Sequence, residues 1–451
     1  MKKKLSLLTS IVLSAVIVSF GAAGCATDLY EEYKDSIDTE MRLSFDFFWN
    51  ECVTDESLPT YGLIVDRWPG NDNYASTASV GFGLTAYVIG AEEGWVTREE
   101  AQERSLGTLE TILAIQADGE NEASPNYHDV AYEGFLAHFI DTRTAARYGD
   151  CEISSVDTAI LLCGALTVGE YFGGEVAEAA EEVYSNVNWN AFIKELGGRT
   201  LISMAYDPET GIVSNGCWDW YAEQLMIYVL GAGSPVEEYR LDDEAYYDFT
   251  RRTGSYGDSG EFIYSYFGSI FTYQYSHAWI DFRGKTDRNG TDWWTNSVNA
   301  SRANYNYCRD MVNSSATFAA GGWGLTACDA PNGYNGYLGT PARGWQPNSD
   351  YYRYEGTVAP AGAIGSVVFT PEESLEALEY YQSLRLLNGA YGLNDSYNLD
   401  YDFYASDCIG IDKGISLLML ANFKNEAVWN VFMQNEHVLS GLENLGFSNV
   451  R

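Results

Sequence analysis

Apolar runs of helical length, separated by capping sequences and glycines, recur along most of this chain. Thr97-Arg98-Glu99-Glu100 is a capping box, and Thr370-Pro371-Glu372-Glu373 adds proline at the first helical position, so both mark helix N-termini. Behind each of them, apolar residues recur at helical spacing. Comparable segments lie at 81–93, 157–172, 177–187, 223–230, 414–423 and 425–432. The pattern predicts an all-α protein built of paired helices.

Strand signals are few, and long polar and aromatic loops lie between the helices. The best strand signal covers 201–213, where Asp207-Pro208-Glu209-Thr210-Gly211 forms a turn between two short apolar segments. Segments 254–300 and 321–360 are rich in Tyr, Trp, Asn, Asp and Gly, and ordered loops of that length usually carry function. No linker appears after residue 40. We therefore expect one domain over 41–451, with one face built of loops.

The first 25 residues have the pattern of a bacterial lipoprotein signal. Lysines at positions 2–4 precede an apolar stretch over 5–20, which is short for a membrane-spanning helix. Ala22-Ala23-Gly24-Cys25 then supplies small residues before a cysteine. We expect a signal peptide over 1–24, lipidation at Cys25 and a polar tether over 25–40. The protein would then be exported and lipid-anchored at the membrane surface of the cell envelope; the alternative is a soluble secreted protein cleaved near Ala23.

The charge balance excludes one large class of partners. The chain has 26 Lys and Arg against 64 Asp and Glu, a formal net charge of −38, so it lacks the basic surface that nucleic acids require. An uncharged sugar is compatible with the negative electrostatic field of such a chain. The 12 Trp, 34 Tyr and 20 Phe combine apolar faces with polar groups, which suits sugar rings as well as protein cores.

Motifs for other chemistries are missing from the sequence. The four histidines, at 128, 138, 277 and 437, show no H-x-x-x-H spacing, so a histidine-based metal site is not predicted. Gly-x-Ser-x-Gly and glycine-rich phosphate loops are absent. The eight cysteines are scattered, without a C-x-x-C pair. No cofactor is implied.

Carboxylates in aromatic surroundings are the candidates for chemistry. Glu223 follows Trp220 and Tyr221, and apolar surroundings raise the pKa of a carboxyl group, as a general acid requires. Glycosidic cleavage needs such an acid and a second carboxylate. Asp157, at the start of an apolar helix, fits either that second role or a helix cap.

Several of these segments, in the same order, resemble a bacterial glycoamylase-like family. That family includes endo-β-1,2-glucanases and is related to domains of cyclic β-1,2-glucan synthases. The resemblance extends from about Leu43 to Trp429. The matching strings lie at 45–49, 62–67, 81–84, 93–101, 138–141, 157–159, 274–277, 323–329, 369–374 and 410–414.

The resemblance implies an (α/α)6 toroid whose long aromatic loops form a cleft at one end. It implies endo-acting hydrolysis of β-1,2-glucan by carboxylate acid/base catalysis. Glu223 matches the glutamate of the family's Asn-Glu-Ala-Met string and is the expected acid, although this chain reads Ala222-Glu223-Gln224-Leu225. Four aspartates match recurrent family acids and stay open as the second carboxylate: Asp141, Asp157, Asp407 and Asp412.

Polar and aromatic residues of the same segments form the expected substrate-binding set. Within it, Asp281 and Arg283 could equally form a plain salt bridge, and outside it His138 could be a hydrogen-bonded core histidine. The set comprises Asp66, Arg67, Trp218, Trp220, Tyr221, Gln274, His277, Trp279, Asp281, Arg283, Trp323 and Asp329.

The expected partner is therefore a polysaccharide or oligosaccharide of the β-glucan class. Three alternatives remain open from the sequence. The first is exo-acting hydrolysis or transglycosylation, and the second is glucoamylase-like action on another glucan. The third is a surface glycan-binding lipoprotein without catalysis, which aromatic loops and a lipid anchor would serve equally well.

Overall fold

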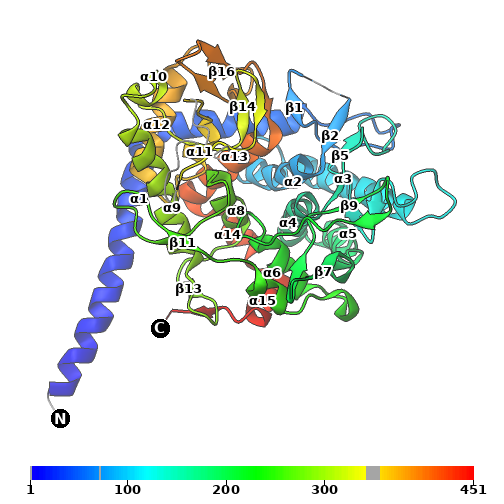
Figure 1. The fold of residues 1–451 in the computed structure, drawn as a ribbon, viewed down its shortest axis with the longest axis horizontal. Helices are drawn as coiled ribbons and strands as arrows, with labels where there is room; N and C mark the ends of the chain where they lie inside the picture. Colours follow the sequence, from blue (N-terminus) through cyan, green and yellow to red (C-terminus); the bar gives the residue numbers. More distant parts are fainter. Residues whose placement is uncertain (1–2, 71–72, 342–355, 451) are drawn as a thin grey trace.

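The computed structural model describes residues 3–70, 73–341 and 356–450, with side chains from Thr27 onward. Helices surround a common centre, and short strands lie in the connections between them (Figure 1). The helices are α1 (Lys3–Asn50), α2 (Thr77–Glu92), α3 (Arg98–Gly119), α4 (Ser155–Phe172), α5 (Gly174–Ser185), α6 (Leu225–Gly233), α7 (Glu244–Asp248), α8 (Tyr275–Trp279), α9 (Trp293–Asp310), α10 (Ala316–Ala319), α11 (Pro360–Ile364), α12 (Pro371–Ser383), α13 (Gly410–Asn425), α14 (Ala427–Phe432) and α15 (Glu436–Asn444).

The helices separate into an inner and an outer group. Within the described residues, α2, α4, α6, α8, α11 and α13 are buried over nearly their whole length. A helix that is apolar on all sides has to lie inside the protein. Helices α3, α5, α9 and α12 bury only one face and cover the inner group from outside. Neighbouring inner helices pack side by side, α13 on α2, α2 on α4 and α4 on α6.

Glycines allow α2 and α4 to approach closely. A Cβ atom added at Gly164 in α4 would lie 2.1 Å from the carbonyl oxygen of Gly81 in α2. One added at Gly81 would lie 2.3 Å from the carbonyl oxygen of Ile160. Both distances are shorter than real carbon contacts, so any larger residue would force the two backbones apart. This crossing fixes the spacing of two inner helices.

The described strands are short and pair with one another in small antiparallel sheets. The predicted turn at 207–211 is confirmed, because Ile212 pairs with Asp207 across it. The strands are β1 (Arg67–Trp68), β2 (Tyr74–Ser76), β3 (Ala131–Tyr132), β4 (Phe135–Leu136), β5 (Phe139–Asp141), β6 (Ile153–Ser154), β7 (Ile193–Leu196), β8 (Arg199–Ile202), β9 (Ala205–Asp207), β10 (Ile212–Val213), β11 (Thr253–Gly254), β12 (Phe262–Ile263), β13 (Lys285–Thr286), β14 (Cys328–Ala330), β15 (Gly333–Asn335), β16 (Asn388–Gly389), β17 (Gly392–Leu393), β18 (Tyr397–Asn398), β19 (Phe403–Tyr404), β20 (Cys408–Ile409) and β21 (Ser448–Asn449).

Most predicted helix ends agree with the structure. The Thr97–Glu100 capping box is formed on both sides and begins α3. Thr370 precedes α12 without a side-chain cap, so there proline alone sets the start of the helix. Helix α9 lies partly in the segment expected to be a loop. Its Asn, Ser and Tyr residues have modest helix propensity, and burial of one face together with the Asp292 cap stabilises it.

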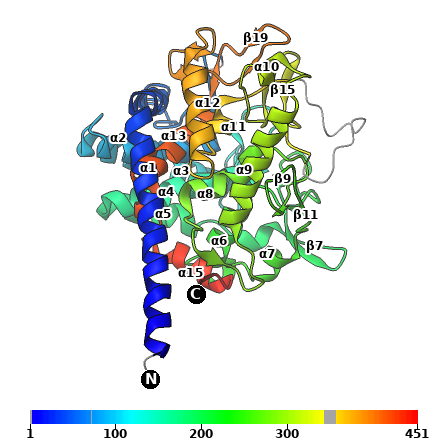
Figure 2. The same cartoon turned by 90° about the vertical axis from the view of Figure 1, so that its left-hand side faces the viewer.

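The N-terminal helix joins the domain earlier than expected. Leu29, Tyr30 and Tyr33 pack against the core, and Ile37 is completely buried. The segment over 25–40 is therefore helical and partly packed rather than a free tether. The preceding part of α1 runs away from the body (Figure 2). Cys25 lies within α1, outside the residues whose side chains the structure describes.

One described helix, α4, is long and apolar enough to cross a membrane when length and composition alone are considered. Its apolar window is 78% buried inside the protein, and it packs against α2, α5 and α6. It is therefore a core helix of the toroid.

Candidate active site

Three candidate carboxylates lie at the N-terminal ends of inner helices. Asp157 is in the first turn of α4, Asp412 is in the first turn of α13, and Glu223 comes two residues before α6. Helix N-termini carry partial positive charge and stabilise nearby anions. The fold therefore collects acidic side chains from distant parts of the chain at one end of the ring.

Two adjoining cavities occupy this end. The first has a volume of about 560 Å³, and its lining includes Glu223, Asp157, Asp412, Asp66 and Arg67. The second has a volume of about 520 Å³ and is bordered by Trp220, Tyr221 and Tyr266, among other described residues. Six residues line both: Met204, Trp218, Glu223, Phe271, Ala327 and Tyr334. Glu223 therefore stands where the two cavities meet, with open space on either side.

The backbone of Glu223 is held by hydrogen bonds from neighbouring elements. Ser276 Oγ donates to the Glu223 carbonyl oxygen at 2.6 Å and accepts from the Met226 amide at 3.0 Å. Gln224, completely buried, donates through Nε2 to the Trp220 carbonyl at 2.7 Å. These contacts fix the loop that enters α6 and with it the direction of the glutamate.

The pKa of Glu223 is raised to about 7, first by burial and further by the negative charge of Asp157. A carboxyl group with such a pKa holds its proton in mildly acidic and neutral solution and can deliver it to a leaving oxygen. The predicted acid thus has the protonation state that its role requires.

Aromatic and apolar side chains form the walls. The indole Nε1 of Trp218 donates to Ser155 Oγ at 3.0 Å, which fixes the ring beside Glu223. Tyr334, at the tip region of the β14–β15 hairpin, is 55% exposed and borders both cavities. Rings with one open face can stack on the apolar faces of sugars, and the tyrosine hydroxyl can hydrogen-bond to their oxygens.

Asp412 has a buried acidic neighbour. Burial and the negative charge of Asp412 raise the pKa of Asp395 well above its usual value, so Asp395 is a neutral acid. Its Oδ2 accepts the Asp329 amide at 2.7 Å, and its side chain also hydrogen-bonds with Asp412. A proton on Asp395 can therefore be donated to Asp412. Burial also raises the pKa of Asp412, which makes it a stronger base than an ordinary aspartate.

Arg67 gathers three further carboxylates beside the first cavity. Its Nε contacts Asp66 at 3.2 Å, and its Nη1 contacts Asp329 at 3.0 Å and Asp407 at 2.9 Å. Asp407 thus neutralises Arg67, and it is not among the described residues that line either cavity. As a second catalytic carboxylate it has a weaker position than Asp157 or Asp412.

Asp141 also has a structural role outside the cavities. Its Oδ1 accepts the amides of Arg143 and Thr144, each at 2.9 Å, and the Thr144 hydroxyl at 3.0 Å. These hydrogen bonds close a turn after β5 and lower the pKa of Asp141 against the opposing effect of burial. Asp141 is not a lining residue of either described cavity.

Several expected substrate-binding residues lie in the core instead. His277 is completely buried, bonds through Nε2 to Ser297 at 2.9 Å, and has its pKa lowered by burial to about 3. Trp279 donates to Thr85 Oγ1, and Gln274 donates to the Gly362 carbonyl. Trp323 donates to the Glu373 carbonyl. These side chains join inner helices to their neighbours, and the structure does not bring them to either cavity.

Asp281 and Arg283 form the salt bridge that was the alternative to a binding role. Arg283 contacts Asp281 at 2.8 Å and Glu426 at 2.6 Å, and its guanidinium lies over the ring of Trp429. Neither residue lines the described cavities. Their place is at the junction of α8, α13 and α14.

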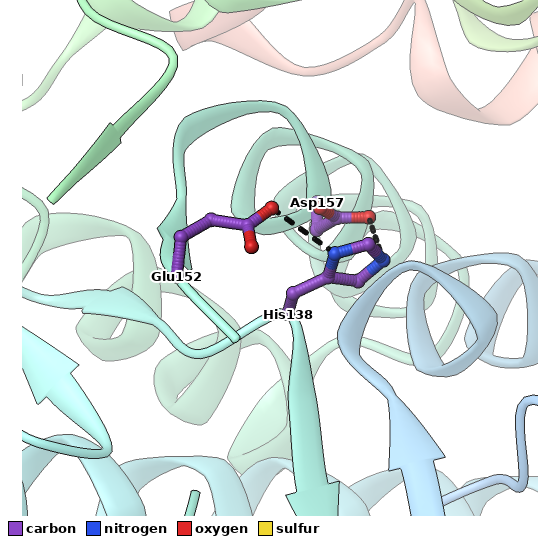
Figure 3. Close-up of side chains that lie close together, drawn as sticks. All are labelled: His138, Glu152 and Asp157. Carbon is purple, nitrogen blue, oxygen red and sulfur yellow. Dashed lines mark hydrogen bonds and ion pairs between the residues drawn. The ribbon is translucent and has the colours of Figure 1, made fainter. Parts of the chain in front are cut away.

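A histidine stands between two carboxylates in the wall of the first cavity (Figure 3). Nδ1 of His138 lies 3.1 Å from Glu152 Oε1, and Nε2 lies 3.9 Å from Asp157 Oδ1. All three residues could offer atoms to a metal ion. However, Glu152 and Asp157 face different nitrogens of the imidazole ring. A single metal ion can bind only one of these two nitrogens. The arrangement suits a protonated imidazole better than a cation site.

Some residues of the site were not expected from the sequence: Glu152, Met204, Phe271, Tyr275, Tyr334 and Asp395. The polar and aromatic composition of the loop indicated that the segment around Tyr334 has a function. It did not single out any residue within that segment. Glu152 lies between a cysteine and an isoleucine, with no local signal.

Comparisons with known proteins agree with this geometry. The Glycoamylase family model, whose description reads "Putative glucoamylase", matches residues 215–436. A protein of Parabacteroides distasonis named exo beta-1,2-glucooligosaccharide sophorohydrolase (non-reducing end) is 26% identical over 444 residues, covering 91% of this chain and 57% of that protein. The chain therefore spans little more than half the length of this relative. The predicted resemblance to the glycoamylase-like family is confirmed.

Solved structures resemble the chain over nearly its whole length. An endo-beta-1,2-glucanase from Chitinophaga pinensis, in complex with sophorotriose and glucose, has a TM-score of 0.78 at 22% identity, covering 92% of this chain and 99% of that one. A beta-1,2-glucanase from Parabacteroides distasonis has a TM-score of 0.76 at 22% identity, covering 92% and 60% respectively. These likenesses confirm the predicted all-α toroid.

Proposed function

We propose that this glycoamylase-like chain is a glycoside hydrolase that cleaves β-1,2-glucan within the chain of sugars. The observation that carries the proposal is the place of Glu223, an acid whose pKa is raised to about 7, where two cavities meet. Aromatic walls beside it and further carboxylates in the lining of the first cavity complete what glycosidic cleavage requires. The names of the similar proteins support β-1,2-glucan as the substrate class.

In the proposed reaction Glu223 donates its proton to the glycosidic oxygen as the bond to the anomeric carbon breaks. A second carboxylate takes a proton from the attacking water, so that the proton count of the site is restored after each turnover. Asp412 fits this role because it lines the first cavity and burial raises its pKa. Asp157 lines the same cavity and acts on Glu223 through its charge.

The open space on both sides of Glu223 supports endo action. A chain end needs room on one side of the acid and a closed end on the other, whereas an internal bond needs sugar sites on both sides. Cavities of about 560 Å³ and 520 Å³ adjoin at Glu223 and offer this room. The relatives' names include both exo and endo enzymes, so product analysis has to test this part of the proposal.

The test is digestion of linear β-1,2-glucan by the purified full chain, with soluble starch in parallel and products resolved by chromatography. We expect a mixture of short oligosaccharides, and a loss of about a hundredfold or more in Glu223→Gln. Glu181→Gln is a matched control, because Glu181 pairs with His437 away from both cavities. It should keep wild-type activity.

Each alternative has its own outcome in this experiment. A single small product would replace endo by exo action, and longer chains would indicate transglycosylation. Products from starch and none from β-1,2-glucan would support the glucoamylase-like alternative. Binding of β-1,2-glucan without any product from the wild type would support a glycan-binding lipoprotein and contradict the hydrolase.

We also propose that the protein is exported and anchored to the membrane through lipid on Cys25. The signal-like sequence before Cys25 supports this, and the N-terminal end of α1 points away from the body (Figure 2). Labelling of cells with a radioactive fatty acid should mark the wild type and not Cys25→Ala. Equal labelling of both would contradict the anchor.

A further inference from the structure

The wall of the first cavity contains a charged group that the proposed reaction does not use directly. His138 lies between β4 and β5, Glu152 immediately precedes β6, and Asp157 is in the first turn of α4 (Figure 3). All three line the cavity that contains Glu223. Glu152 stands on the solvent side, 44% exposed, and Asp157 on the inner side, 12% exposed.

The backbone fixes the position of the histidine. The His138 amide donates to the Glu152 carbonyl at 2.9 Å, and the His138 carbonyl accepts the Thr77 amide of α2 at 3.1 Å. The ring stacks on Phe139, with 3.9 Å between ring centroids. With the ring held in place, Nδ1 faces Glu152 and Nε2 faces Asp157. The hydrogen bond to Glu152 needs a proton on Nδ1, and attraction of Asp157 across 3.9 Å needs the positive charge that only the imidazolium carries.

We propose that His138 and Glu152 are positioning residues of the active site: Glu152 fixes the Nδ1 proton of His138, and the imidazolium holds the carboxylate of Asp157 in the cavity that it shares with Glu223. The inference rests on the proposed function. It assigns to His138 no contact with the glucan and no proton transfer to it.

The electrostatics agree with the geometry. Burial alone would lower the pKa of His138, but Asp157, Glu152 and Asp66 together raise it to about 9. The nearby Cys151 thiol has its pKa raised to about 11, mainly by burial, so it is neutral and does not compete. The histidine pairing in turn lowers the pKa of Glu152, which stays an anion. At neutral pH the three groups therefore form an anion–cation–anion row.

Loss of Glu152 has a consequence that depends on pH. In Glu152→Gln the charge that favours the imidazolium is smaller, so the pKa of His138 falls from about 9, while Asp157 and Asp66 still hold it above the ordinary value for histidine. At pH 5 the imidazolium is still present and Asp157 remains held. As the pH rises from 7 toward 9 the variant loses the proton that the wild type keeps longer, and the positioning of Asp157 is lost with it.

The experiment measures two quantities on the full chain. The first is the pKa of His138, followed by NMR of protein with ¹³C-labelled histidine; there are four histidines, and His138→Gln identifies the signal. We expect a proton held to about pH 9 in the wild type, a pKa lower by at least one unit in Glu152→Gln, and no change in Glu181→Gln. Glu181→Gln is a matched control because it removes the partner of His437, also at 3.1 Å.

The second quantity is kcat on β-1,2-glucan from pH 5 to 9. The ratio of Glu152→Gln to wild type should be near one at pH 5 and fall about fivefold by pH 9, with KM little changed. His138→Gln should be about tenfold slower at every pH, and Glu152→Asp should recover part of the loss.

The outcomes separate this inference from the proposed function. A ratio that does not change with pH, or an unchanged pKa of His138 in Glu152→Gln, would overturn the positioning role while an active wild type leaves the hydrolase in place. A wild type without activity on any glucan would overturn the hydrolase, and with it the reaction that His138 and Glu152 are proposed to serve.

Discussion

Replacing Glu223 by glutamine should make the protein more stable in neutral and alkaline solution and leave its stability unchanged in acid. The pKa of Glu223 rises from 4.5 to about 7 on folding because burial penalises the charged form. In the unfolded chain the same group ionises freely above its ordinary pKa. The folded wild type therefore loses stability as the pH rises from about 4.5 to about 7, and the loss is constant above that. Glutamine has no charge to bury at any pH.

The size of the effect follows from the shift. One pKa unit corresponds to about 1.4 kcal/mol, so the whole shift corresponds to about 3 kcal/mol. Glu223 is partly exposed to the cavity, and solvent there reduces the penalty to about 2–3 kcal/mol. The entropy of unfolding scales with chain length, and for 451 residues about 1 kcal/mol corresponds to about 1 °C in Tm. We expect Glu223→Gln to melt about 2–3 °C above the wild type at pH 8.

The assay is thermal unfolding of both proteins at several pH values between 4 and 9. The difference in Tm should be near zero at pH 4, grow up to about pH 7 and then stay constant. Effects of all other titrating groups cancel in the difference, because both proteins share them. A difference that is constant over the whole range, or that has the opposite sign at pH 8, would refute the argument that Glu223 is a buried acid.

Three other perturbations test the packing and the chemistry. Lys413→Met leaves Glu40 as an unpaired buried charge, because the two side chains form an ion pair at 2.5 Å and are almost fully buried, and it should cost about 3–5 kcal/mol in urea unfolding. Gly164→Ala should cost about 1–3 kcal/mol of folding stability by forcing two inner helices apart. Gly336→Ala, with no atom within 4 Å of the new Cβ, should cost far less. Equal losses of stability in thermal unfolding would show that the close approach of the helices is unimportant. The pH profile of kcat/KM on β-1,2-glucan should fall about tenfold per unit above pH 7 as Glu223 loses its proton, and constant activity up to pH 9 would contradict its role as the acid.

Helix positions were predictable because their signals are local. A capping box such as Thr97–Glu100 determines its own hydrogen bonds, and the apolar runs of α2, α4 and α13 are buried because no face of them is polar. Helix α9 has the Asp292 cap but no apolar run, and tertiary packing of one face rather than propensity stabilises it. The toroid itself was expected only from the family resemblance.

The site was predictable in part for a related reason. Glu223 stands out because aromatic neighbours in the sequence are also its neighbours in space. His277 has the same local surroundings, yet its segment forms the short inner helix α8, and the residue is buried at 1% exposure. Local composition does not distinguish a cavity wall from a core. Asp395 and Glu152 act through partners that are distant in the sequence, so no local pattern reveals them.

The ion pair between α1 and α13 limits where the protein can be cut free of a membrane. Cleavage of α1 ahead of Leu29 would remove only the part that runs away from the body, and the released domain would keep its packing. Cleavage after Glu40 would instead remove the counter-ion of Lys413, the residue that follows Asp412 in the lining of the first cavity. A protease that cuts ahead of Leu29 would then release an intact domain, and one that cuts after Glu40 would release a damaged domain. The two positions differ by about a dozen residues.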